Sequence, residues 1–86
     1  MHDTFLLNKI SDSLQKICSE NKISKIEKIT LVVNYNSHIN EENLLEHLKL
    51  HNSDIIASKL IIKIHRKNIE EQTAIIESID GETIAK

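Results

Sequence analysis

Apolar residues recur at every third or fourth position over about residues 4–21, and this spacing predicts an amphipathic helix. Its apolar stripe consists of Leu6, Leu7, Ile10, Leu14, Ile17 and Cys18. From Lys25 to Tyr35 the period shortens to two residues, which predicts a strand with one buried face. The side chains expected on that face are Ile29, Leu31, Val33 and Tyr35. A second helix is expected over about residues 40–51, with Asn40 as its N-cap.

Alternation returns over residues 58–67, and a further strand is expected around Thr73–Ile79. Asp80-Gly81 is a dipeptide typical of a two-residue turn, so a short strand over Glu82–Ala85 is expected to close a small hairpin. The resulting order, α-β-α-β-β, predicts an α+β fold. In that fold two helices pack on one face of a three- or four-stranded, mainly antiparallel sheet. Since no proline or linker-like stretch interrupts residues 1–86, a single domain is expected.

Composition excludes several classes of function. Gly81 is the only glycine, so a glycine-rich phosphate-binding loop is excluded. The net charge is −2 and no basic stripe with aromatic residues is present, so no nucleic-acid partner is expected. No apolar run is long enough to cross a membrane, and no secretory leader is expected. Cys18 is the only cysteine, which fits the cytoplasm and excludes both an internal disulfide and a cysteine-based zinc site.

The chain begins Met1-His2-Asp3, and this start carries the clearest candidate chemistry. A free terminal amine, the backbone nitrogen of His2 and the His2 imidazole can all reach one metal ion. Asp3 adds a backbone nitrogen and a carboxylate. Such a nitrogen-rich planar set suits Ni(II) or Cu(II). The alternative for His2 is an exposed terminal histidine without a function, and the alternative for Asp3 is the N-cap of the first helix.

The other candidate side chains have simpler interpretations. His47 and His51 lie four residues apart on the second predicted helix, a spacing that suits either a two-imidazole metal site or a solvated pair. His38 is expected in a turn, and His65 on a solvated strand face. Cys18 is expected to be a small buried residue rather than a reactive thiol. No nucleophile–base arrangement is found, so the protein is not expected to be an enzyme.

Several segments resemble the HypA/HybF family of hydrogenase and urease nickel-incorporation proteins. The similar segments are the Met1-His2-Asp3 start with Phe5-Leu6-Leu7 behind it, Ile26–Val33, Ser37–Leu44, Ala57–Ile62 and Ile79–Ile84. The resemblance implies Ni(II) held by Met1, His2 and the third residue, which is Asp3 here and glutamate in the family. It also implies a nickel-handling GTPase or a hydrogenase large subunit as partner. The family's four-cysteine zinc ribbon has no counterpart between Arg66 and Ala74, so no zinc is expected.

The sequence therefore predicts a cytoplasmic, metallochaperone-like accessory protein that holds Ni(II) at its N-terminus for hydrogenase maturation or for another nickel enzyme. The alternative is a metal-free module of the same fold that docks onto another protein or forms a homodimer.

Overall fold

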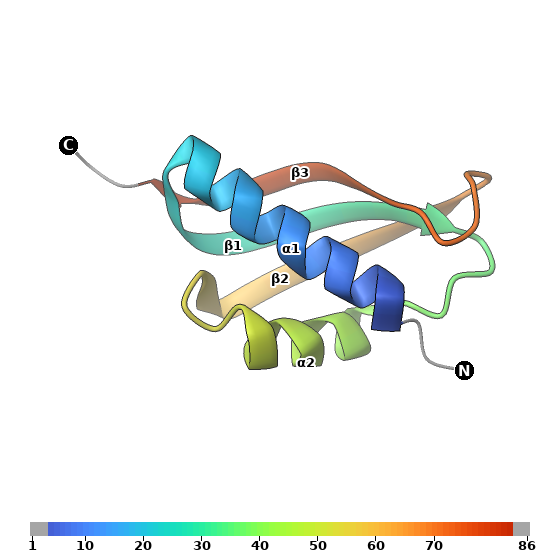
Figure 1. Cartoon of the computed structure of the whole chain (residues 1–86), viewed down its shortest axis with the longest axis horizontal. Helices are drawn as coiled ribbons and strands as arrows, with labels where there is room; N and C mark the ends of the chain where they lie inside the picture. Colours follow the sequence, from blue (N-terminus) through green and yellow to red (C-terminus); the bar gives the residue numbers. More distant parts are fainter. Residues whose placement is uncertain (1–3, 84–86) are drawn as a thin grey trace.

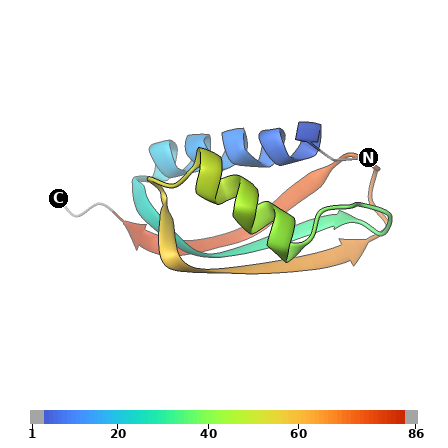
Figure 2. The same ribbon diagram turned by 90° about the horizontal axis from the view of Figure 1, so that it is seen from below.

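The computed structural model describes residues 4–83 and contains two helices and three strands (Figure 1). The elements follow one another as α1 (Thr4–Asn21), β1 (Ile23–Asn34), α2 (Glu41–His51), β2 (Ile56–Lys67) and β3 (Ala74–Thr83). Both helices lie on the same face of the sheet, and the other face is left open (Figure 2). The predicted α+β fold with helices packed on one sheet face is confirmed. Within residues 4–83, no helix combines the length and apolar character needed to cross a membrane.

Local sequence accounts for both helices. α1 buries Leu6, Ile10, Leu14 and Cys18, which share one face because they lie three or four positions apart. It stops at Lys22, whose φ of 57° leaves the helical region. α2 starts after Asn40, which accepts a hydrogen bond from the Asn43 backbone N–H while the Asn43 side chain accepts one from the Asn40 N–H. This reciprocal capping satisfies two backbone donors at the start of the helix.

The sheet has the order β2-β1-β3, with the first strand of the chain in the middle. β1 and β3 are antiparallel, whereas β1 and β2 are parallel. A mainly antiparallel sheet was expected, whereas the observed sheet is mixed, with one parallel and one antiparallel pair. The parallel pair has a direct cause: α2 lies between the two strands in the chain and forms the crossover that parallel neighbours require.

The alternation predicted for the first strand places three residues in the core. Ile29, Leu31 and Val33 are all fully buried. Tyr35 was expected beside them but is 63% exposed, because β1 ends at Asn34 and the chain turns there. Around these residues one apolar cluster joins the helices to the sheet; its buried members are Leu6, Ile10, Leu14, Cys18, Ile26, Ile29, Leu31, Ile39, Leu44, Leu48 and Ile56.

The turn predicted at Asp80-Gly81 is wrong, because β3 runs straight through both residues. Gly81 lies opposite Ile26 on β1, in a stretch where the register between the two strands shifts. A Cβ atom at Gly81 would lie 2.1 Å from the backbone oxygen of Lys25. The glycine is therefore needed for the close approach of two strands. The expected fourth strand is absent over Glu82–Thr83, which belong to β3, and its remaining residues lie outside the described range.

Replacing Gly81 with alanine is expected to lower the free energy of unfolding by about 1–3 kcal/mol, the usual cost of forcing a methyl group into a filled space. The backbone atoms that it meets cannot rotate away as a flexible side chain would. Urea denaturation measures the loss. Ser78→Ala on the same strand, at an exposed position, is the matched control and should change stability by less than about 0.5 kcal/mol. Equal effects of the two substitutions would contradict the close approach.

Candidate functional site

The predicted nickel ligands Met1, His2 and Asp3 lie outside the described residues. The helix that follows them, α1, begins at Thr4 and is anchored to the sheet through Leu6 and Ile10, each 2% exposed. Met1, His2 and Asp3 thus stand directly before a helix that is fixed on the core. The assignment of the three residues as ligands stays a prediction.

The two histidines of α2 come together as their spacing predicts. The ring centroids of His47 and His51 are 4.3 Å apart, and the planes are tilted by 39°. The Nε2 atom of His47 is buried and has no hydrogen-bond partner. Within residues 4–83, however, no group of three or more histidine, cysteine, aspartate or glutamate side chains is arranged to hold a metal ion. The pair therefore supplies two imidazoles without a third ligand from the described part of the chain.

Burial of His47 gives the pair a consequence for stability. Desolvation, and secondarily the nearby His51, lower the pKa of His47. The His47 imidazole therefore binds a proton more readily in the unfolded chain than in the folded chain. The contribution of His47 to the free energy of unfolding is present at neutral pH and is lost as the pH falls below about 6.5. The variant His47→Gln is expected to weaken this pH dependence, measured as the difference in melting temperature between about pH 7.5 and pH 5.

The control for this prediction is His65→Gln, since His65 lies exposed on β2 and is opposite Val32 in the sheet register. It removes an imidazole without changing the environment of α2. If His47→Gln and the wild-type chain lose melting temperature equally on acidification, His47 is not the residue responsible.

The remaining candidates occupy structural positions. Cys18 is 4% exposed in the core, and burial raises the pKa of its thiol. His38 lies exposed in the loop before α2, and its backbone oxygen accepts a hydrogen bond of 2.9 Å from the Asn43 side chain. The prediction of a buried cysteine is thus confirmed, whereas His38 follows the turn at residues 35–36 and lies in the loop that leads to α2.

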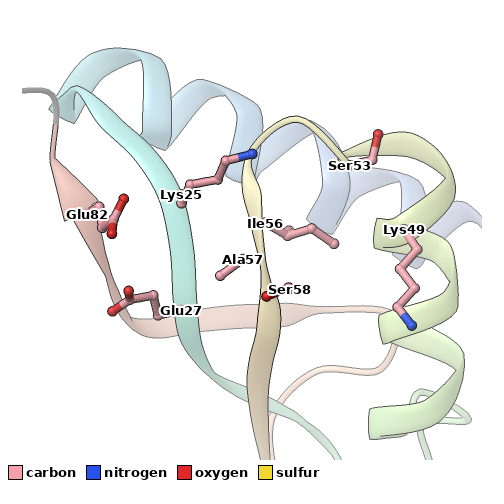
Figure 3. Close-up of a pocket in the computed structure, with 8 residues that line it drawn as sticks. All are labelled: Lys25, Glu27, Lys49, Ser53, Ile56, Ala57, Ser58 and Glu82. Atoms are coloured by element: carbon pink, nitrogen blue, oxygen red, sulfur yellow. The ribbon is translucent and has the colours of Figure 1, made fainter.

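A hollow of 570 Å³ at the start of β2 was not anticipated from the sequence (Figure 3). It forms where β2 leaves the register of β1: Ile26 is opposite Ile56, but Lys28 is already opposite Ile61. Figure 3 shows the carboxylates of Glu27 and Glu82 on the β3 side of the hollow, while the amines of Lys25 and Lys49 lie toward the loop before β2 and toward α2. The charges are separated rather than convergent, so they do not form a charged cluster around one point.

Sequence reasoning also missed two polar anchors. The Ser11 hydroxyl donates a hydrogen bond of 2.5 Å to the Asn52 side-chain oxygen, and both residues are buried between α1 and the end of α2. The Arg66 guanidinium donates to the backbone oxygens of Ser37 and Ile39, at 2.8 and 2.5 Å. Neither contact could be predicted from a local sequence pattern, because each joins residues that lie more than 25 positions apart. Both fix loops rather than forming a reactive site.

No protein-family model and no curated protein matches this chain. The resemblance to the HypA/HybF family is therefore carried by the short segments quoted from the sequence.

Proposed function

We propose that this chain is a cytoplasmic accessory protein that holds Ni(II) as cargo and passes it to a partner that matures a nickel enzyme. In a chain that starts with a free amine at Met1, that amine, the His2 backbone nitrogen and the His2 imidazole form adjoining chelate rings around one ion. Asp3 supplies a further backbone nitrogen or its carboxylate. By the resemblance, the recipient is a nickel-handling GTPase or a hydrogenase large subunit.

The observation that carries this proposal is the adjacency of the ligands in the sequence Met1-His2-Asp3. A chelate built from consecutive residues needs no assistance from the rest of the fold. Because α1 begins at the next residue, Thr4, the ligands are joined directly to a helix packed on the core. A partner that binds α1 would therefore contact a surface that is directly adjacent in sequence to the nickel ligands.

The chemistry of the ligands sets the conditions for loading and release. The amine and the imidazole must lose protons before they bind, so nickel affinity is expected to fall as the pH drops. The same nitrogen set binds Cu(II) more tightly than Ni(II) according to the Irving–Williams order. Selectivity for nickel would then depend on metal supply and on the docking partner.

The direct test is a calorimetric titration of Ni(II) into untagged protein that starts at Met1, together with an absorption spectrum of the loaded chain. The proposal predicts one ion per chain and the absorption band of a planar nickel site. A chain that binds no nickel under these conditions would overturn it.

One observation favours the alternative function, a metal-free interaction module. The open sheet face carries two large apolar side chains that are about half exposed, Ile61 at 54% and Ile75 at 48%. Ile75 is opposite the buried residue Val32 in the register, whereas Ile61 is opposite Lys28, four positions away along β1. Ile75 and Val32 thus form a small apolar area on the open face, to which a partner protein would bind through aliphatic contacts.

A further inference from the structure

The outer edge of β3 is free within the described part of the chain. β3 pairs with β1 on one side, and the sheet order β2-β1-β3 places no described strand on its other side (Figure 1). β2 has the same position at the opposite edge. Backbone N–H and C=O groups along such an edge remain available to pair with an added strand.

The two edges differ in their protection against pairing. β2 carries the basic side chains Lys59, Lys63, Arg66 and Lys67, and lysines on an edge strand are a common device against unwanted pairing. β3 contains no lysine, arginine or proline. Its charged residues are all acidic and exposed: Glu77, Asp80 and Glu82. β2 is therefore protected, whereas β3 is left open and carries acidic side chains. Asp80 and Glu82 lie opposite Lys28 and Lys25 of β1, so lysines already accompany these carboxylates on the inner side of the strand.

An apolar groove runs beside this open edge. It has a volume of 490 Å³ and lies between α1 and β3, where the half-buried side chains of Ile17, Ile76 and Ile79 line it. A smaller hollow of 70 Å³ continues toward Thr73 and shares Ile76 with the groove. The helix-facing side of the β3 edge thus offers aliphatic contacts along most of the strand.

From Ile79 to Thr83 the side chains of β3 alternate between the groove and the acidic side of the strand. Ile79 and Thr83 line the groove, as does Ser78, whereas Asp80 and Glu82 do not line it and are exposed. Gly81, between Ile79 and Thr83 on the groove side, adds no side chain and leaves that stretch of the edge unobstructed. Against β1 the register shifts between Ile76 and Ser78, and again at Gly81 and Glu82, where the additional residues belong to β1. On β3 itself, residues 78–83 pair one after another without an additional residue.

From this arrangement we infer that the β3 edge binds an extended segment of another protein in which aliphatic residues alternate with lysine or arginine. The aliphatic side chains enter the groove beside Ile17 and Ile79. The basic side chains lie on the other face, within the cross-strand distance of about 5 Å at which opposite charges stabilise a strand pair. The β3 edge of a second copy does not fit, because it would bring acidic side chains against acidic side chains.

The test uses a labelled peptide of about eight residues in which valine and lysine alternate, a typical strand length. Fluorescence anisotropy should show saturable binding, and the amide chemical shifts that change should belong to β3 and α1. The same peptide with glutamate in place of lysine should not bind. Equal binding of the two peptides, or shift changes centred on β2, would overturn the inference.

Paired variants locate the contact. Asp80→Asn combined with Glu82→Gln removes two opposite-charge contacts and should raise the dissociation constant of the lysine peptide about 2- to 30-fold. Glu70→Gln combined with Glu71→Gln makes the same change in charge in the exposed loop before β3 and should leave the constant unchanged. Equal weakening by both pairs would show a non-specific charge effect and would overturn the assigned site. Concentration-dependent self-association in sedimentation velocity, abolished by the peptide, would assign the edge to a second copy instead.

Discussion

The His2→Ala chain is expected to lose tight Ni(II) binding while keeping its fold. The substitution removes the imidazole that closes one chelate ring, so the affinity should fall by more than about 100-fold, beyond the loss typical of changes around a metal ligand. The buried residues of α1 begin at Leu6, so the substitution leaves the apolar core intact. Nickel titration by calorimetry measures the affinity, and an unchanged melting temperature of the metal-free protein verifies the fold.

Two further chains make this result specific. One extra glycine before Met1 converts the terminal amine into an amide and should weaken binding as strongly as His2→Ala. His47→Ala combined with His51→Ala removes the other adjacent imidazoles and should have little effect, because that pair lacks a third ligand among residues 4–83. If the extended chain binds nickel as tightly as the native start, the ion is held elsewhere. If no chain binds nickel, the metal-free interaction module is the better account.

The Leu14→Ala chain is expected to lose about 2–5 kcal/mol of unfolding free energy, as measured by urea denaturation. Leu14 is fully buried in the cluster that joins α1 to the sheet, and truncation leaves a cavity that the strands cannot close. The loss is a large share of the roughly 5–15 kcal/mol that stabilises a typical domain.

Gln15→Ala is the matched control, since residue 15 neighbours Leu14 but is exposed. Alanine is a strong helix former, so this change should be nearly neutral. A cost below about 1 kcal/mol for Leu14→Ala would contradict the assigned core.

Periodicity predicts those parts of the fold that depend on local chemistry. The first helix has the predicted limits, residues 4–21, because its apolar stripe is continuous and the chain leaves the helical conformation at Lys22. Asn40 acts as the predicted N-cap, since its side chain satisfies a backbone donor within its own helix. Because neighbouring residues determine the limits of α1 and the N-cap of α2, a short stretch of sequence is enough to predict them.

Features decided by distant segments could not be predicted in this way. Asp80-Gly81 has the local chemistry of a turn, but pairing with β1 holds it in a strand. Alternation over β2 shows that the segment is extended and contains no information about its direction, which the crossover through α2 determines.

The same distinction holds for the candidate sites. The Met1-His2-Asp3 chelate is recognisable because its ligands are consecutive. The groove beside β3 is formed by Ile17 and Ile76, which are far apart in the chain. Ile17 belongs to the predicted apolar stripe with Ile10 and Leu14, yet it lies at the margin of the core, where it lines this groove.

The central position of β1 also determines the order in which the chain can fold. Ile29 on β1 is paired with Ile62 on β2 and with Ile79 on β3, so both partners are synthesised long after β1 itself. Sheet contacts between segments so distant in the chain carry a high entropy of loop closure and slow the folding of small domains. The edge of β1 that pairs with β3 must remain unpaired until Ala74–Thr83 have been made, after β2 has become available for the other edge. During that interval α1, which precedes β1 in the chain, is the first cover available for the aliphatic side chains of β1.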